Sequence, residues 1–139
     1  MTQTPDLDAI ARNQPPFARY LGIKVVSATP DEVVAELHVS PDLLNRNGTL
    51  HGGAVMAICD NMGGTATFLN LKPGQSTVTV ESKTNFLRAI PAGDTITCTS
   101  TPLHKGRKTQ IWQTTVRRSD GKTAAIVTQT QMVLDDPKF

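Results

Sequence analysis

The chain has 139 residues, enough for one domain with a single hydrophobic core but too few for two. Fourteen Lys and Arg against twelve Asp and Glu leave a net charge of +2, and only one Trp, one Tyr and four Phe are present, so neither charge nor stacking surfaces indicate a nucleic-acid partner. No apolar run approaches the ~20 residues of a membrane-spanning helix, and the N-terminus lacks the basic-then-apolar order of a signal peptide, so we expect no membrane contact and a cytoplasmic location.

The first part of the chain predicts a polar leader and then two strands. Residues 1–16 contain a short helical pattern that ends at a proline pair, and we expect this leader to pack loosely or to cap one end of the domain. Residues 23–28 and 32–39 are strand-like and are separated by a Thr-Pro-Asp turn signal. The second strand alternates apolar and polar residues, which is typical of a strand with one buried face.

A helix is predicted from about Gly53 to Leu69, after a glycine-rich loop. Its apolar residues recur at helical intervals, and Asp60 is the only formally charged side chain between Arg46 and Lys72. The pattern predicts a mostly buried helix, in which a charge is costly unless it is paired or used. Asp60 is therefore the first candidate for a functional residue.

Four strand-like segments follow the helix, at residues 76–87, 95–103, 109–118 and 123–134. Turn signals separate them, and the last separator contains the Asp-Gly pair of a hairpin. The order of strand, strand, long helix and four strands predicts an α+β domain with a single antiparallel sheet and one central helix.

The helix start offers chemistry that complements Asp60. Its first backbone N–H groups have no partner inside the helix, and glycine lets another molecule approach Gly53 closely, so this end could hold the oxyanion of an acyl-transfer intermediate. Seven residues separate Gly53 from Asp60, so both point to nearly the same side but lie roughly 10 Å apart along the axis, at ~1.5 Å per residue. Two antiparallel copies of the helix would bring Gly53 of one chain opposite Asp60 of the other, which predicts a homodimer with two equivalent sites.

Asn45, five residues, His51-Gly52-Gly53, six residues and then Asp60 form a specific pattern. With this pattern the chain resembles the hot-dog-fold acyl-CoA thioesterases of the phenylacetate-degradation (PaaI-like) branch, and the resemblance extends over about residues 17–134. The resemblance implies a curved antiparallel sheet wrapped around one long central helix. It also implies hydrolysis of an aromatic or fatty acyl-CoA to the free acid and coenzyme A, in a homodimer or a dimer of dimers (tetramer).

The resemblance assigns roles to five residues. Asp60 would act as general base for water or as nucleophile, and the Gly53 N–H would donate to the thioester oxygen. Asn45 would lie near the carbonyl or the water, although asparagine is also an ordinary turn residue here. His51 would lie beside the site or be satisfied by backbone alone. Thr79 would place a hydroxyl near the attacking water, although threonine is expected in any such strand.

Coenzyme A carries phosphates, so basic residues are expected near the pocket mouth. The candidates are Arg88, Lys105, Arg107 and Lys108, all of which could equally be solvated turn residues. No metal or redox cofactor is expected, because the three histidines and two cysteines lack the spacing of a zinc site. Cys59 is expected to be a small buried residue.

The sequence leaves three alternatives to a thioesterase. A serine hydrolase is disfavoured because no GxSxG motif occurs. A hot-dog dehydratase or hydratase is the nearest enzymatic alternative, but its histidine with Phe-Pro signature is missing. The third alternative is a non-catalytic acyl-CoA-binding module that acts as a sensor.

Overall fold

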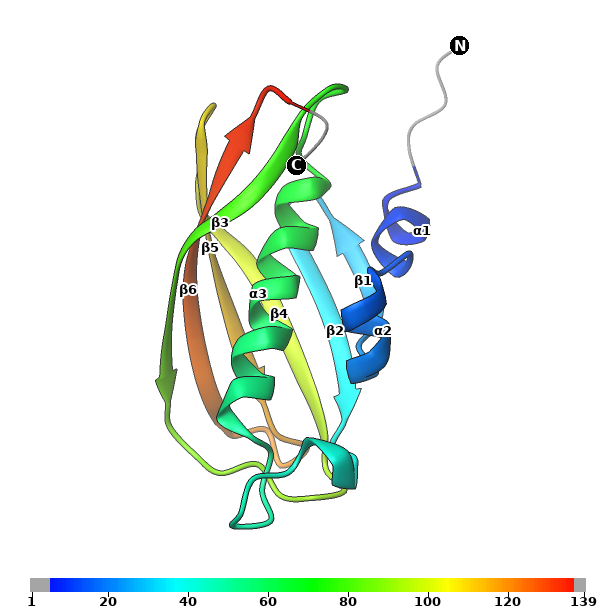
Figure 1. Ribbon diagram of the computed structural model, residues 1–139, viewed down its shortest axis with the longest axis vertical. Coiled ribbons are helices and arrows are strands. Elements are labelled where there is room, and N and C mark those ends of the chain that lie inside the picture. The colour runs from blue at the N-terminus through cyan, green and yellow to red at the C-terminus, as the bar shows by residue number, and fades with distance from the viewer. Residues whose placement is uncertain (1–5, 137–139) are drawn as a thin grey trace.

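A curved six-stranded antiparallel sheet wraps around one long helix in the computed structural model of the protein, which describes residues 6–136 (Figure 1). The strand order across the sheet is β1-β2-β4-β5-β6-β3, so β1 and β3 form its two edges. The strands are β1 (Lys24–Thr29), β2 (Glu32–His38), β3 (Ser76–Phe86), β4 (Thr95–Lys105), β5 (Thr109–Arg117) and β6 (Thr123–Leu134). This arrangement confirms the expected α+β architecture, with strand ends within two residues of the predicted ones.

The central helix, α3 (Gly52–Phe68), begins and ends one residue before the predicted positions. One side of it is buried against the sheet through Val55, Ile58, Cys59, Met62, Gly63, Ala66 and Thr67. The sheet contributes apolar side chains from its inner face to the same core, among them Leu37, Ile96, Trp112 and Val127. At about 25 cal/mol per Å² of buried apolar area, this interface is the main source of stability of the fold.

The alternation in β5 and β6 shows which residues face α3. In β5 the buried residues are Gln110, Trp112, Thr114 and Val116, in strict alternation with partly exposed ones. In β6 the buried phase continues from Val127 through Gln129 to Gln131, so polar side chains occupy inward-facing positions at one end of the sheet. These two glutamines reach Asp60 of α3 and Thr79 of β3.

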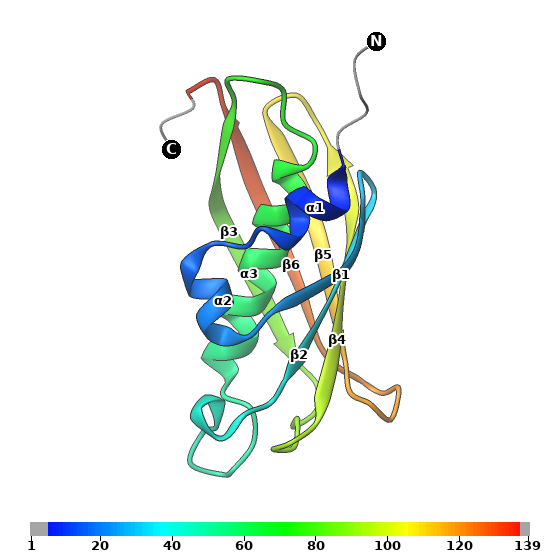
Figure 2. The same ribbon diagram turned by 90° about the vertical axis from the view of Figure 1, so that its right-hand side faces the viewer.

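The N-terminal segment forms two short helices that cover the domain, instead of a loose leader. Helix α1 (Leu7–Arg12) and helix α2 (Pro16–Leu21) lie across α3 and β1 (Figure 2). Ala11, Ala18 and Leu21 are buried there. Of the two arrangements expected of the leader, loose packing or capping, the described residues show packing against the domain, where these three small or apolar side chains cover part of the side of α3 that the sheet leaves open.

A short 3-10 helix, η1 (Pro41–Leu43), leads from β2 into the glycine-rich loop before α3. Gly48 in this loop has φ of 76°, a left-handed conformation that glycine adopts without strain. The loop is held to the rest of the domain by the Leu50 N–H, which donates to Ile90 O at 2.9 Å, and by the His51 N–H, which donates to Leu43 O at 2.8 Å. The start of α3 is thereby fixed in place.

Among residues 6–136, no helix is long and apolar enough to cross a membrane.

Candidate active site

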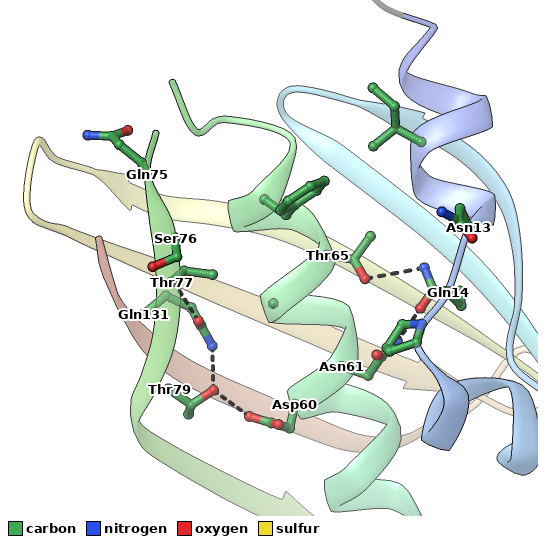
Figure 3. Close-up of a pocket in the computed structure, with 14 residues that line it drawn as sticks. Asn13, Gln14, Asp60, Asn61, Thr65, Gln75, Ser76, Thr77, Thr79 and Gln131 are labelled. Atoms are coloured by element: carbon green, nitrogen blue, oxygen red, sulfur yellow. Dashed lines mark hydrogen bonds between the residues drawn. The ribbon is translucent and has the colours of Figure 1, made fainter. Parts of the chain in front are cut away.

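Asp60 lies on the outward side of α3, where its carboxylate contacts the strands β3 and β6 (Figure 3). Its Oδ1 accepts a hydrogen bond from Thr79 Oγ1 at 2.7 Å and another from Gln129 Nε2 at 2.9 Å. Among the described residues no hydrogen bond reaches Oδ2. One oxygen of the carboxylate is therefore anchored, and the other is left for a ligand.

The sequence predicted that Asp60 would be buried, and in the single chain it is exposed. The reason is geometric, because the sheet covers only the inner side of α3. Residues on the outer side, including Gly53, Met56 and Phe68 as well as Asp60, remain exposed.

A second layer of polar groups holds Thr79 in place. Gln131 Nε2 donates to Thr79 Oγ1 at 2.6 Å, and Gln131 Oε1 accepts from Thr77 Oγ1 at 2.9 Å. Since the hydroxyl of Thr79 accepts this bond, its single hydrogen is left to donate to Asp60. The structure thus brings Thr79 and Asp60 together, as expected of a shared site, but the hydroxyl points at the carboxylate itself.

A β-bulge in β3 lies directly next to Thr79. The pairing with β6 runs from Thr79–Gln131 to Glu81–Thr130, so Val80 is the extra residue. Bulges bend a strand and re-aim side chains, and they occur often beside active sites.

The carboxylate opens into a cleft of about 560 Å³ between α3, the start of β3 and the α1–α2 connection. Apolar side chains from Ile10, Pro15 and Phe68 line it together with polar ones from Asn61, Thr65 and Thr77. The wall on the α1 side is fixed by Gln14, whose Oε1 accepts from Asn61 Nδ2 at 2.7 Å and whose Nε2 donates to Thr65 Oγ1 at 3.3 Å. The N-terminal helices therefore form part of the site, a role that the sequence did not indicate.

His51 caps the N-terminus of α3. Its Nδ1 accepts a hydrogen bond from the Gly53 N–H at 2.8 Å, which leaves the proton of the neutral ring on Nε2. The predicted oxyanion donor, the Gly53 N–H, is thus engaged within the chain, whereas no hydrogen bond from the Gly52 N–H to a described residue is present. His51 and Gly53 line a second, smaller cleft of about 220 Å³, separate from the one that contains Asp60.

Asn45 organises the loop that leads to His51. Its Oδ1 accepts from the Asn47 N–H at 2.9 Å and from the Thr49 N–H at 3.1 Å, and its Nδ2 donates to Thr49 Oγ1 at 3.0 Å. These contacts are the ones expected of an Asx-turn residue. The structure places Asn45 on the same loop as His51 and Gly53, but not beside Asp60 of the same chain.

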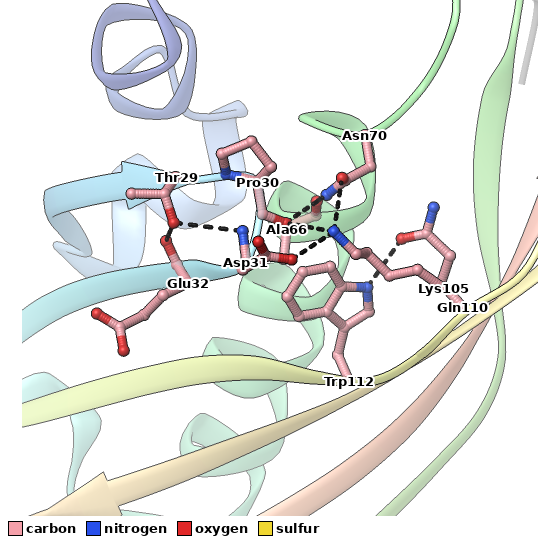
Figure 4. A network of polar contacts seen from close by, with 9 residues as sticks. All are labelled: Thr29, Pro30, Asp31, Glu32, Ala66, Asn70, Lys105, Gln110 and Trp112. Carbon is pink, nitrogen blue, oxygen red and sulfur yellow. Dashed lines mark hydrogen bonds and ion pairs between the residues drawn. The ribbon is translucent and has the colours of Figure 1, made fainter.

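The four basic residues proposed for phosphate binding do not form one cluster. Lys105 pairs with Asp31 and also contacts Asn70 just beyond the end of α3, so its charge is partly neutralised (Figure 4). Arg107 and Lys108 are exposed in the adjoining β4–β5 turn. Arg88 lies just after β3, near the opposite end of α3, and its guanidinium donates to Thr123 O at 2.7 Å.

Cys59 is buried, as predicted, and so is the second cysteine. Cys59 and Cys98 are free thiols and fully buried, and His38 and His104 are exposed. A hydrogen bond with Cys98, together with burial and the nearby charge of Asp60, raises the pKa of the Cys59 thiol well above its ordinary value. Cys59 therefore stays protonated and packs as a small apolar residue.

The sequence model of the thioesterase superfamily matches residues 47–125, which include the loop, α3 and most of the sheet. The chain belongs to the thioesterase superfamily. This match agrees with the resemblance that the Asn45–His51–Asp60 pattern indicated.

Three solved structures share the fold of this superfamily member. Thioesterase HI1161 of Haemophilus influenzae superposes with a TM-score of 0.82 at 28% identity and covers 96% of this chain and 92% of its own. The phenylacetic acid degradation protein PaaI of Thermus thermophilus has a TM-score of 0.78 at 27% identity, over 85% and 98% of the two chains. The protein smu.793 of Streptococcus mutans, solved with bound acetyl-CoA, has a TM-score of 0.77 at 28% identity, over 84% and 91%. The protein has the hot-dog fold, and its neighbours include the PaaI-like branch.

Two residues at the site, Gln129 and Gln131, were missed by the sequence analysis. The sequence does contain an indication of them, because both glutamines fall at the alternate positions of β6 that Ala125 and Val127 occupy, on the buried face of the strand. A long polar side chain at a buried strand position needs a partner. Which partner it has depends on the pairing of β6 with β3 and on its packing against α3, neither of which is local in sequence.

Proposed function

We propose that the protein hydrolyses an acyl-CoA thioester to the free acid and coenzyme A, with Asp60 as the catalytic carboxylate. The observation that carries this proposal is the asymmetry of that carboxylate. Oδ1 is held by two side-chain donors, whereas Oδ2 has no hydrogen bond from the described residues, and Asp60 lines a cleft of about 560 Å³. A carboxylate held in this way suits proton transfer, because the hydrogen bonds to Oδ1 fix the position of the group while Oδ2 remains free to accept a proton.

In the base mechanism, Asp60 Oδ2 takes a proton from water while the water oxygen adds to the thioester carbon. The carbonyl oxygen carries the negative charge of the tetrahedral intermediate, which then collapses with cleavage of the C–S bond. The thiolate of coenzyme A leaves and is protonated in turn. In the alternative mechanism Oδ2 attacks the same carbon, the C–S bond breaks and the thiolate of coenzyme A leaves, and water later hydrolyses the resulting mixed anhydride to the free acid and the Asp60 carboxylate.

The oxyanion donor belongs to a second copy of the chain in this proposal. Gly53 and Asp60 line different clefts of one chain, and at ~1.5 Å per residue they are separated by roughly 10 Å along the helix axis. The Gly53 N–H would have to share or release its bond to His51 Nδ1 when the thioester oxygen arrives. Such donors are worth on the order of 10²–10³ in rate.

An exposed apolar surface supports a homodimer formed along α3 and β3. Met56 is 45% exposed, Val80 56% and Phe86 55%, and β3 is an edge strand that pairs only with β6. A surface of this kind on an edge strand favours association with a second copy, which we propose to be the dimer that completes both sites. A dimer of dimers is compatible with the same half-sites.

The CoA part of the substrate is proposed from chemistry and from one neighbour. The structure of smu.793 contains acetyl-CoA, and this chain offers exposed cations at Arg107 and Lys108 near one end of α3 and at Arg88 near the other. Either group could contact the phosphates, depending on how the second copy is placed. The mixed apolar and polar lining of the Asp60 cleft is compatible with aromatic and fatty acyl groups alike.

The test is a panel of acyl-CoA substrates with detection of the released thiol, run on the wild type and on Asp60→Asn. Asparagine keeps the size of the side chain but is neither a base nor a nucleophile, so turnover should fall by at least about 10²-fold. A folded Asp60→Asn protein with wild-type turnover would exclude the assigned role. Saturable binding of acyl-CoA without thiol release by the wild type would favour the sensor.

A mixing experiment tests whether the site is shared. Asp60→Ala chains and Gly53→Pro chains should each be inactive, and their mixed dimers should regain one intact site. Mixed dimers that demonstrably form but stay inactive would contradict the shared site, provided circular dichroism shows that Gly53→Pro retains its helix content.

A further inference from the structure

Gln129 reaches from β6 to the far side of the catalytic carboxylate. Its side chain is only 2% exposed, and its Nε2 donates to Asp60 Oδ1 at 2.9 Å and to the main-chain oxygen of the same residue at 3.1 Å. Contact with both a side-chain and a main-chain oxygen of one residue fixes the χ angles of Asp60 relative to the helix. The same Nε2 also donates to Thr79 Oγ1 at 3.2 Å. The amide must present its nitrogen on this side, because both Asp60 oxygens are acceptors and the hydrogen of the Thr79 hydroxyl is donated to Asp60.

The other end of the Gln129 amide is unpaired. Its Oε1 is fully buried, and none of the described residues donates a hydrogen bond to it. An unsatisfied buried acceptor destabilises the fold, and an apolar side chain of the same length would avoid that penalty. Stability therefore does not explain a glutamine at this position, whereas its N–H group on the carboxylate does.

Gly63 provides the space that the amide occupies. A Cβ atom at Gly63 would lie 2.3 Å from Gln129 Oε1 and 2.5 Å from its Cδ, much closer than any real contact. Glycine is unfavourable in the middle of a helix, and Gly63 lies well inside α3. The neighbouring Gly64 meets nothing within 4 Å of such a Cβ, so the close approach is specific to Gly63.

We propose that Gln129 is a positioning residue for the catalytic carboxylate and that Gly63 is required in α3 to admit its amide. The inference rests on the proposed thioesterase function. Gln129 holds Oδ1 from the sheet side while Thr79 holds it from the edge strand, so that Oδ2 is directed into the cleft. Because Gln129 lies on β6 and Gly63 on α3, the orientation of Asp60 depends on the contact between this strand and the helix, and not on the helix alone.

The first experiment compares Gln129→Met with Gln110→Met. Methionine matches glutamine in length and removes only the polar atoms. We expect Gln129→Met to lose roughly 10- to 100-fold in kcat/KM, the effect of one hydrogen bond to a charged group, with the loss mainly in kcat. Its midpoint of urea unfolding should be unchanged or higher, because the unpaired acceptor is gone.

Gln110 is the matched control because it is a buried glutamine on the neighbouring strand that does not contact Asp60. It is 5% exposed, and its Oε1 accepts from Trp112 Nε1 at 3.0 Å. Gln110→Met leaves that buried N–H without a partner, so we expect a lower unfolding midpoint and a kcat close to that of the wild type. A merely structural role of Gln129 would give its variant the same signature as this control.

The second experiment tests the pairing with Gly63. Gly63→Ala alone should displace the amide and lower kcat to about the level of Gln129→Met, because the two changes remove the same contact. In a Gln129→Ala background the obstacle is absent, so adding Gly63→Ala should cause no further loss of kcat and should raise the unfolding midpoint. Additive losses of kcat in the double variant would overturn the role of Gly63.

The outcomes separate this inference from the function on which it rests. If the wild type releases no thiol from any acyl-CoA, the proposed function fails. If the wild type is active and Gln129→Met keeps a wild-type kcat, with or without the lowered unfolding midpoint of the control, the positioning role of Gln129 is refuted.

Discussion

Replacing Thr79 by valine removes one hydroxyl from the site and changes little else. Valine has the shape of threonine and favours strands equally, so the backbone of β3 should not change. Three contacts disappear with the hydroxyl: the donation to Asp60 Oδ1 at 2.7 Å, the acceptance from Gln131 Nε2 at 2.6 Å and a longer acceptance from Gln129 Nε2 at 3.2 Å. Gln129 Nε2 keeps its bonds to Asp60, so the first two contacts matter most. These contacts affect different quantities and can be measured separately.

The first loss acts on catalysis and the second on stability. A hydrogen bond to a charged group is worth about 1.5–3 kcal/mol, so kcat/KM should fall about 10- to 100-fold if Thr79 positions Asp60. Gln131 is 1% exposed, and leaving its N–H group without a partner should lower the free energy of unfolding by about 1–3 kcal/mol. Thr79→Ser keeps the hydroxyl and should stay close to the wild type in both respects.

The assays are thiol release from an acyl-CoA and equilibrium unfolding in urea. The double variant Thr79→Val/Gln131→Leu provides the control, because it removes both partners of the buried hydrogen bond, and Thr77 Oγ1, which also donates to Gln131, keeps Met132 O as an acceptor at 2.9 Å. Its stability should recover while its activity stays low. Wild-type kcat/KM in Thr79→Val, or a double variant less stable than the single one, would refute this reasoning.

Three further predictions concern the interface, the helix cap and the thiols. Val80→Asp places a charge on the exposed apolar edge strand, so sedimentation should shift from dimer to monomer with loss of activity. His51→Ala should lower the free energy of unfolding by about 1 kcal/mol through loss of the N-cap, and His51→Asn should restore it. Cys59 and Cys98 should not react with a thiol reagent at pH 8 until the protein unfolds, because both are buried and the pKa of Cys59 is raised.

Each of these three predictions has a contradicting result. Val26 is exposed on β1, the opposite edge strand, so Val26→Asp is the matched control and should remain dimeric. Equal effects at both edges would mean that the interface lies elsewhere. A His51→Asn protein as unstable as His51→Ala would show that the cap contributes nothing, and rapid labelling of the native thiols would contradict their burial.

The course of the chain was largely predictable from sequence because its signals are local. The strand and helix limits follow turn residues such as Pro30, Gly93 and Gly121, and the apolar periods of the segments differ clearly. The candidate residues Asp60 and Thr79 were also identified, and the structure places them in contact. Asp60 was a candidate because a lone charge in an apolar helix is unusual, and Thr79 was a candidate through the resemblance to the family.

The rest depended on contacts between distant segments. The burial of Gln14 against α3 and the approach of Gln129 to Gly63 each join parts of the chain at least 47 residues apart, so no local pattern specifies them. The exposure of Asp60 was mispredicted for a related reason. The spacing of apolar residues along a helix indicates how much of its surface is buried. It does not show whether that surface is buried against the sheet or against another chain.

The bulge at Val80 divides β3 into two halves that are out of phase. Before it, Thr79 faces α3, and after it the same face is taken by Thr84, whose hydroxyl is buried, and by Phe86, which lies over Gly52. Glu81 bonds Thr130 on the opposite face. If Val80 took a regular place in the alternation, counting by twos from Thr79 would turn Glu81 and its charge toward the helix. Deleting Val80 would leave the pairs Thr79–Gln131 and Glu81–Thr130 as they are, whereas deleting a residue after the bulge, such as Ser82, would turn Thr84 and Phe86 away from the helix.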